Sequence, residues 1–269
     1  MRVFANHAHL MPPEVMPDAD LADLRRQMDA LEIERAVCFA PFQRMFREAG
    51  RQDDANQWLA DRIAGEESLL GFACLDPTLP ESLAALERME QWGFLGVKLH
   101  PAADEFDVAD PRALDFYRAA SERDLVLDFH TGLHGCRMRN LEPLKFDDLA
   151  WCLPLARLVL EHMGGVAFFE QAMAVVMNHA LEGLPRVFAG ITSVVRQDFG
   201  AWSLGPEGVT RCARLCGPQA LIFGLDFPYH TVEQLRDQMG TLRALDLGPD
   251  GQRLLFGGNL ARLLGVEWE

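Results

Sequence analysis

Long uninterrupted apolar stretches are missing from this sequence of 269 residues. None approaches the roughly 18 to 20 consecutive apolar residues that a membrane-spanning helix needs, so we expect no membrane association. The N-terminal residues lead directly into a histidine pair and lack the basic, apolar and cleavage regions of a signal peptide. We therefore expect a cytoplasmic protein.

Cysteine pairs of the CxxC type and an excess of positive charge are absent as well. The six cysteines lie mostly among apolar neighbours, which predicts buried, reduced thiols rather than a zinc ribbon or a disulfide framework. Forty acidic residues against 25 basic ones give a formal net charge of -15. Because such a surface repels phosphate backbones, we do not expect nucleic acid as a partner.

No low-complexity tract, linker or break in composition divides the chain, so we expect a single domain over residues 1–269. Short β-rich runs alternate with amphipathic helical patterns from end to end. The expected strands are Val3–His7, Arg35–Phe39, Leu69–Cys74, Leu95–His100, Leu125–His130, Ala156–His162, Arg186–Gly190 and Ala220–Leu225. This alternation predicts an α/β fold, a (β/α)8 TIM barrel with slight distortion allowed. The alternative, an open doubly wound sheet, would want a glycine-rich phosphate loop after the first strand, and residues 9–13 do not resemble one.

Two histidines flank one residue in the first apolar run, Phe4-Ala5-Asn6-His7-Ala8-His9. Residues two apart in a strand point to the same face, with Cα atoms roughly 6.6 Å apart at about 3.3 Å rise per residue. Imidazoles at that separation can converge on one divalent ion. The pair alone is a weak signal, because histidines also pair in strands by chance. It needs further ligands at the ends of later strands.

Further polar residues stand at the ends of the expected strands, where a barrel carries its active residues. They are Lys98, His100, His130, His162 and Asp226. Three of them have a purely structural alternative: His130 could bond a backbone carbonyl, His162 could be a core histidine, and Asp226 could cap the next helix. A carboxylate at the end of the last strand would, however, face the histidine pair once the barrel closes.

Taken together, these segments resemble the amidohydrolase superfamily, in particular its amidohydrolase-related branch (amidohydrolase 2), which includes aminocarboxymuconate-semialdehyde decarboxylase and small-lactone hydrolases. The resemblance rests on His7-Ala8-His9, Gly96-Val97-Lys98-Leu99-His100-Pro101, Asp128-Phe129-His130-Thr131-Gly132, Glu161-His162-Met163-Gly164-Gly165, Gly224-Leu225-Asp226-Phe227-Pro228 and Gly258-Asn259-Leu260-Ala261-Arg262-Leu263-Leu264-Gly265. These motifs span nearly the whole chain in the expected order.

The resemblance implies one divalent metal ion held by His7, His9, His130 and Asp226. Zinc suits these donors best, and manganese matches them less well in softness. Asp226 would also accept a proton from a metal-activated water, and His162 would hydrogen-bond the substrate carbonyl oxygen and donate to the leaving group. This chain departs from the branch at two points. Members commonly have an aspartate where Ala5 stands here, and its loss removes a possible partner for a metal ligand. The glycine-serine that often precedes the last aspartate is Gly224-Leu225 here, a milder difference.

Lys98 and His100 share a strand face, and we expect both to contact the substrate, with Lys98 orienting an anionic group. In some relatives a lysine on this strand is instead carboxylated and bridges two metals, which is the alternative for Lys98. His134, His179 and His230 are expected to be mainly structural, although His230 follows Asp226 closely enough to join the site.

The expected activity is hydrolysis of a small-molecule lactone, ester or amide. Non-oxidative decarboxylation of an unsaturated or aromatic carboxylic acid is the alternative, because the same site can assist protonation of the carbon that loses carbon dioxide. A catalytically idle barrel that serves as a binding module is a third interpretation, and the complete ligand set argues against it. A homo-oligomer is compatible with such barrels, but nothing in the sequence fixes its size.

Overall fold

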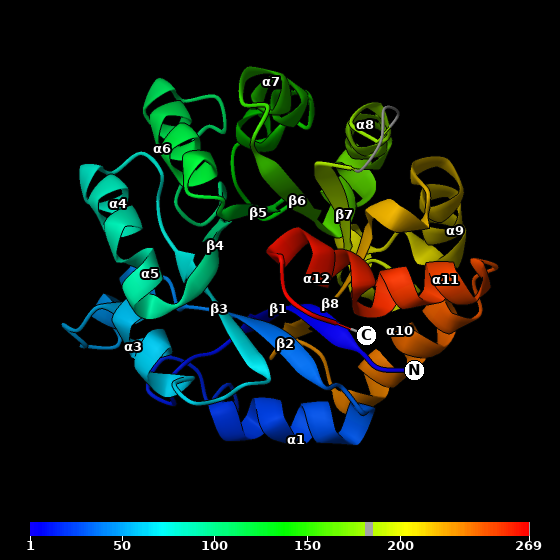
Figure 1. The fold of residues 1–269 in the computed structure, drawn as a ribbon, viewed down its shortest axis with the longest axis horizontal. Helices are drawn as coiled ribbons and strands as arrows, with labels where there is room; N and C mark the ends of the chain where they lie inside the picture. Colours follow the sequence, from blue (N-terminus) through cyan, green and yellow to red (C-terminus); the bar gives the residue numbers. More distant parts are fainter. Residues whose placement is uncertain (181–184, 269) are drawn as a thin grey trace.

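The computed structural model describes residues 1–180 and 185–268. Eight parallel strands close into a barrel in sequence order, so that the last strand pairs with the first (Figure 1). The strands are β1 Phe4–His9, β2 Arg35–Phe39, β3 Leu69–Cys74, β4 Phe94–Leu99, β5 Val126–His130, β6 Arg157–Glu161, β7 Val187–Ile191 and β8 Leu221–Phe227. The predicted (β/α)8 barrel is confirmed, and each predicted strand lies within two residues of an observed one.

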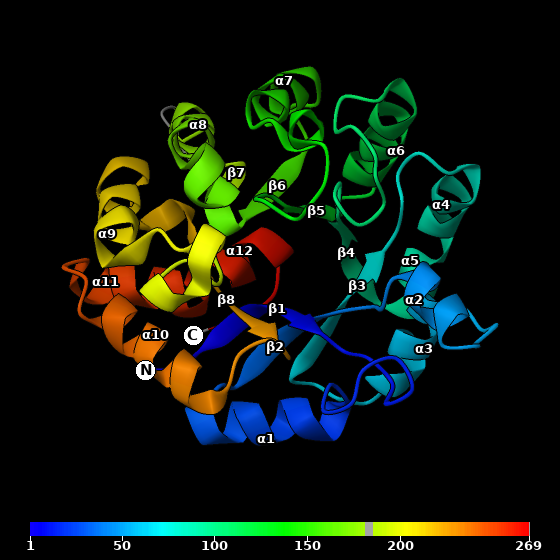
Figure 2. The same cartoon turned by 180° about the vertical axis from the view of Figure 1, so that it is seen from behind.

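Helices surround the barrel on its outer side (Figures 1 and 2). They are α1 Leu21–Leu31, α2 Gln43–Glu48, α3 Ala55–Arg62, α4 Pro80–Ala85, α5 Met89–Trp92, α6 Pro111–Glu122, α7 Leu144–Cys152, α8 Gly165–Asn178, α9 Gly205–Cys216, α10 Val232–Arg243, α11 Gly248–Arg253 and α12 Asn259–Leu264. Short 3-10 segments cover 86–88, 138–141, 162–164, 197–202 and 218–220, and a π-helical turn covers 254–258. Among the described helices, none has the length and apolar character needed to cross a bilayer.

Capping side chains fix where several helices begin after the preceding loop. Asp20 accepts hydrogen bonds from two backbone N–H groups of the first turn of α1, and Asp54 does the same for α3. Thr231 and Gln234 form a reciprocal capping box at the start of α10. Such caps satisfy N–H groups that have no partner inside the helix, so they define the length of the loops at the strand ends.

A bulge in β1 interrupts the regular register on both of its edges. The pairing shifts between Ala5 and Ala8 against β2, and between Asn6 and Ala8 against β8. At the N-terminal end of the barrel, the indole of Trp268 packs against the ring of Phe4, with ring centroids 5.4 Å apart. The C-terminal segment therefore lies against the start of β1, and the opposite end of the barrel carries the polar residues described next.

Candidate active site

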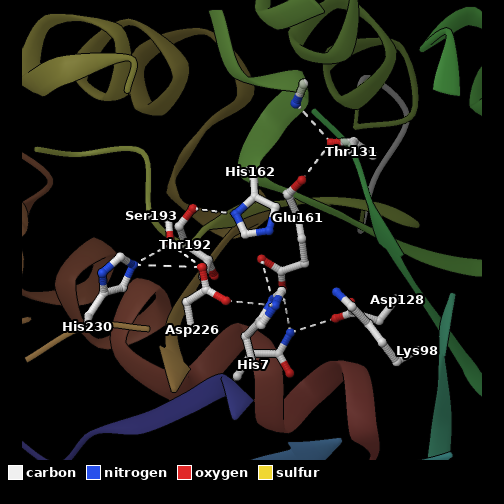
Figure 3. Close-up of polar contacts among 12 residues, drawn as sticks. His7, Lys98, Asp128, Thr131, Glu161, His162, Thr192, Ser193, Asp226 and His230 are labelled. Carbon is white, nitrogen blue, oxygen red and sulfur yellow. Dashed lines mark hydrogen bonds and ion pairs between the residues drawn. The ribbon is translucent and has the colours of Figure 1, made fainter. Parts of the chain in front are cut away.

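Four polar residues at the C-terminal ends of strands have a backbone conformation that residues with a Cβ rarely adopt. The angle φ is 67° at His7, 65° at His162, 60° at Ser193 and 53° at Asp226. Residues held in such regions cost of order 1–3 kcal/mol each and persist where the surrounding structure enforces them, often at functional sites. Their side chains gather at the ends of β1, β6, β7 and β8 (Figure 3). The strain marks this end of the barrel as the candidate site.

His7, His9 and Asp226 lie together, as a closed barrel predicts. Each offers a potential metal-ligand atom, and these atoms all lie within 4.8 Å of one another. The centroids of the two imidazole rings are 5.0 Å apart, and His7 Nε2 lies 3.3 Å from Asp226 Oδ1. The predicted proximity of the histidines is confirmed. The bulge at His7 contributes to it, so simple strand alternation was an incomplete reason.

The protonation states of these three residues suit metal binding. Burial lowers the pKa of His7 and His9, and the ammonium of Lys98 lowers it further. The pKa of His9 falls to about 3, so its ring is neutral at neutral pH and keeps a lone pair. Burial opposes ionisation of Asp226, but the surrounding histidines outweigh it and keep the pKa of this carboxyl below its ordinary value.

Both ring nitrogens of His7 face carboxylate oxygens. Nδ1 lies 3.3 Å from Glu161 Oε2, and Nε2 lies 3.3 Å from Asp226 Oδ1. A neutral imidazole carries only one hydrogen, so one nitrogen must face an oxygen with lone pair against lone pair. That contact is repulsive unless a cation joins the two atoms. In the described part of the chain, buried His9 Nδ1 also lacks a hydrogen-bond partner. These residues therefore fit a divalent cation.

His130 adjoins this group from β5 but belongs to a second one. Its potential ligand atom lies within 4.8 Å of those of His100 and His134. Its ring stacks on that of His100, with centroids 3.8 Å apart and planes at 9°, and lies 4.9 Å from the ring of His162. Its buried Nε2 has no hydrogen-bond partner among the described residues. His130 as a metal ligand stays a prediction.

His162 follows β6 and lies beside the metal-ligand group. Its ring centroid is 5.1 Å from that of His7 and 4.7 Å from that of Trp202. Nδ1 lies 2.9 Å from the backbone carbonyl oxygen of Thr192. A carbonyl only accepts hydrogen bonds, so Nδ1 carries the hydrogen of the neutral ring and Nε2 is an acceptor. His162 can donate from Nε2 only when the ring is doubly protonated.

Ser193 and His230 support Asp226, and the sequence indicated only the second of them. The Ser193 hydroxyl donates to Asp226 Oδ2, and His230 Nε2 lies 2.6 Å from Ser193 Oγ. Phe199 stacks on the His230 ring, with centroids 4.3 Å apart and planes at 19°. Because the Ser193 hydrogen goes to Asp226, His230 must supply the N–H of its contact with Ser193. No local sequence motif predicts Ser193 as a site residue, because it lies in the loop after β7.

The two predicted substrate-binding residues have different surroundings. Lys98 Nζ donates to Asp128 Oδ1 at 2.8 Å in the barrel interior and lies 4.8 Å from the centroid of the Phe39 ring. Carboxylation of Lys98 stays the alternative. His100 Nδ1 accepts the Ala103 N–H at 3.1 Å, which leaves its hydrogen on Nε2 as a donor. Substrate contact by both residues stays a prediction.

A cavity of about 810 Å³ lies between residues of the loops that follow β2, β3 and β4, and the described residues that line it include none of the histidines. Phe42 lines it and also contacts the site, with ring centroids 6.3 Å from His9 and 5.5 Å from His100. Arg44 and Asp104 stand elsewhere on its wall. Burial raises the pKa of Asp104 to about 7. The cavity is large enough for a small molecule, and Phe42 is its contact with the histidine cluster.

The chain belongs to the amidohydrolase family, whose model matches residues 7–266. The predicted family is therefore confirmed. A comparison with curated protein sequences gave no match.

Solved structures resemble the chain over almost its full length. A dihydroxybenzoic acid decarboxylase from Polaromonas sp. JS666, with bound manganese and the inhibitor 2-nitroresorcinol, has a TM-score of 0.70 at 16% identity, covering 98% of this chain and 96% of that one. A zinc-bound amidohydrolase from Burkholderia multivorans has 0.69 at 18% identity, covering 99% and 100%. A probable 2-pyrone-4,6-dicarboxylic acid hydrolase from Acinetobacter baumannii with bound citric acid has 0.66 at 16%, covering 98% and 100%. At these identities the likeness establishes the fold alone.

Proposed function

We propose that this protein is a metal-dependent hydrolase that acts on a small carbonyl substrate, namely a lactone, an ester or an amide. The observation that carries the proposal is the group formed by His7, His9 and Asp226, with its potential ligand atoms within 4.8 Å of one another. His130 is the predicted fourth ligand from the adjoining wall. Membership of the amidohydrolase family supports an enzymatic role.

The donor set indicates which ion these residues would hold. Imidazole nitrogens with one carboxylate suit zinc. Manganese is the second choice, because it prefers oxygen donors and the site offers only one carboxylate. A divalent ion in such a site polarises a carbonyl and lowers the pKa of a coordinated water from about 15.7 toward about 7. Zinc and manganese are each bound in one of the similar structures, which supports this assignment.

Asp226 is the proposed general base. Its depressed pKa keeps the carboxylate ionised at neutral pH, so it can accept a proton. Oδ2 accepts the Ser193 hydroxyl hydrogen, which fixes the orientation of the group, while Oδ1 faces His7. A base held in one orientation can accept the proton that an attacking water loses as it adds to the carbonyl carbon.

His162 is the proposed carrier of a proton to the leaving group. Its Nδ1–H is bonded to the Thr192 carbonyl, so Nε2 is free to accept a proton. Once the ring is doubly protonated, the same nitrogen donates to the leaving oxygen or nitrogen. The predicted hydrogen bond from His162 to the substrate carbonyl oxygen also requires this doubly protonated ring. The Nε2–H of His100 offers a further donor to a substrate oxygen.

Non-oxidative decarboxylation of an unsaturated or aromatic acid is the second candidate function. The proton that replaces carbon dioxide on carbon would come from Nε2 of doubly protonated His162, because the Nδ1–H is bonded to the Thr192 carbonyl. The likeness to a dihydroxybenzoic acid decarboxylase supports keeping this candidate. Both candidate functions use an ionised Asp226 as a metal ligand, and hydrolysis also uses it as the base that removes a proton from water.

A screen in water enriched in oxygen-18 separates the two functions. Purified protein with a measured metal content is incubated with lactones, esters and amides, and separately with unsaturated and aromatic carboxylic acids. The proposal predicts oxygen-18 in a carboxylic acid product without release of carbon dioxide. Carbon dioxide release with no water added to the product would establish the decarboxylase instead. His162→Asn is the control that distinguishes the enzyme from a contaminating activity.

A further inference from the structure

A continuous chain of buried polar side chains lies beneath the candidate metal centre (Figure 3). Lys98 Nζ donates to Asp128 Oδ1 at 2.8 Å. Asn6 Nδ2 donates to Asp128 Oδ2 at 2.7 Å and to Glu161 Oε1 at 2.6 Å, so it joins the two carboxylates. Glu161 reaches His7 Nδ1 through its other oxygen. All five residues are at most 1% exposed, so their polar atoms depend on one another for partners.

Three atoms of these five residues lack a hydrogen bond among the described residues, namely Asn6 Oδ1, Glu161 Oε2 and His7 Nδ1. Glu161 Oε2 and His7 Nδ1 lie 3.3 Å apart. A carboxylate oxygen accepts, so their contact is favourable when Nδ1 carries the hydrogen of the neutral ring. With the hydrogen on Nε2 instead, two acceptors would face each other in the interior, and both would keep their desolvation cost.

The charges around Glu161 decide which side of His7 faces a cation. His7, Asp128 and Glu161 also offer ligand atoms within 4.8 Å of one another. The Lys98 ammonium and the Asn6 amide hydrogens, however, already occupy oxygens of both carboxylates there. A further cation at that place would meet these positive groups at short range. The opposite side of His7 offers Asp226 and the lone pair of His9.

We propose that Glu161 is a positioning residue for the metal centre. Its carboxylate accepts the Nδ1 hydrogen of His7 and so turns the Nε2 lone pair toward Asp226 and the metal. Asn6 and the Lys98–Asp128 ion pair hold Glu161 in place. The inference rests on the proposed metal site, because a fixed tautomer serves a ligand. Partners of this kind orient metal-bound histidines and raise their basicity.

Gly190 on β7 gives independent support for a specific position of the Glu161 carboxylate. A Cβ at residue 190 would lie 2.2 Å from Glu161 Oε2 and 2.5 Å from its Cδ. The carboxylate therefore packs flat against the backbone of the neighbouring strand, with which Glu161 is in register. Only glycine leaves the room for this placement, so Gly190→Ala should displace the carboxylate from His7.

Glu161→Gln tests the proposal with almost no change in volume. The amide oxygen can still accept from Asn6, but the NH2 group then faces His7 Nδ1 and offers a hydrogen where an acceptor stood. We expect zinc affinity, measured by competition with a chelator, to fall by about 10- to 100-fold. The matched control is Glu170→Gln on α8, where an exposed glutamate pairs with Arg211. That variant should bind zinc as the wild type does.

The tautomer of His7 in the metal-free protein is the second readout, and a merely structural role would leave it unchanged. Nitrogen-15 NMR should show the hydrogen on Nδ1 in the wild type and on Nε2 in Glu161→Gln. Wild-type zinc affinity together with an unchanged tautomer in that variant would overturn the proposal. If Glu161→Gln does not fold, Gly190→Ala is judged by the same two criteria. If the wild type binds neither zinc nor manganese, the proposed function fails, and the tautomer comparison still decides the role of Glu161.

Discussion

The two ring nitrogens of His7 connect the proposed metal centre to the polar interior of the barrel. One faces Glu161 and the other faces Asp226, each at 3.3 Å. The backbone of His7 has a φ of 67°, and this conformation fixes the direction in which its side chain leaves β1. A residue in that position acts on metal binding through both its ring and its place in β1.

His7→Ala and His9→Ala should each remove the metal. Loss of one ligand from a set of three or four should cost at least the roughly 100-fold that loss of a supporting partner can cost. Metal content after dialysis, measured by plasma emission spectrometry, checks this. The control is His179→Ala, because His179 pairs with Asp147 at 3.0 Å away from the candidate site. Full metal occupancy in both site variants would remove them from the ligand set.

His162→Asn should keep the metal and lose turnover. Asn cannot carry a proton to the leaving group, so kcat should fall by about 100- to 10,000-fold, the usual contribution of general acid–base catalysis. Steady-state kinetics at matched metal content is the measurement, with His179→Asn as the control. A variant with wild-type kcat would end the catalytic role of His162.

At the residue scale, the sequence predicted the candidate site better than its supports. His7, His9, His130, His162 and Asp226 all lie where strand ends predicted them. Glu161 and Ser193 were missed for different reasons. Glu161 follows three apolar residues of β6, and only the strand register shows that its carboxylate reaches another strand. Ser193 depends on the path of a loop, which local patterns do not predict.

Strand β8 shows how an element positions the site. Gly224 on β8 is in register with Asn6 on β1, and a Cβ there would lie 2.1 Å from Thr192 Oγ1 and 3.2 Å from His7 Cβ. The close packing of β1, β7 and β8 thus needs glycine at this position. Because the contacts are with the backbone and short side chains, the neighbours cannot yield cheaply.

Gly224→Ala should destabilise the fold by about 1–3 kcal/mol, the usual cost of overpacking a core. It should also weaken zinc binding, because His7 must move. Gly240→Ala in α10 is the matched control: its Cβ would meet nothing within 4 Å, and the helix should gain up to about 1 kcal/mol. Denaturant unfolding of both variants tests the pair. Equal stability of Gly224→Ala and the wild type would contradict the packing argument.

Element boundaries were predictable to the extent that apolar runs define them. β2 and β3 begin and end at the predicted residues. β1 and β8 extend further than predicted, because the polar residues His9 and Asp226 continue the strands instead of ending them. In sequence, a polar residue after an apolar run indicates the start of a loop. The predicted ends of β1 and β8, which carry polar site residues, therefore come too early.

The described part of the molecule buries several histidines, and their burial makes the stability of the fold depend on pH. Burial lowers the pKa of five histidines, which are His7, His9, His100, His130 and His230. The unfolded chain takes up protons at these sites below about pH 6.5, while the folded protein does not. Each therefore leaves the stability unchanged above that pH, and below it lowers the free energy of unfolding by up to about 1.4 kcal/mol per pH unit until its folded-state pKa is reached.

Buried Asp104 acts in the opposite direction. Burial raises its pKa to about 7, so the folded protein holds a proton there that the unfolded chain has released. It offsets part of the histidine effect between about pH 4 and 6.5. We still expect the metal-free protein to lose stability from pH 7.5 to pH 5, as measured by denaturant unfolding. Equal or greater stability at pH 5 would contradict the neutral state of the buried histidines.

At the scale of the molecule, the alternation of strands and helices was sufficient to predict the closed barrel. Closure itself predicted that Asp226 would face the first strand, and His7 confirms it at 3.3 Å. The sequence could not show how the polar interior is paired. The ion pair of Lys98 with Asp128 depends on the register of β4 and β5, which apolar patterns leave undefined.

Anomalous diffraction at the zinc edge, from crystals of the zinc-loaded protein, would locate the proposed metal site. We expect one strong peak within bonding distance of His7, His9 and Asp226, at about 2.0–2.2 Å from their nitrogen and oxygen atoms. A peak confined to His100, His130 and His134, or no peak at the barrel end, would contradict the proposed site.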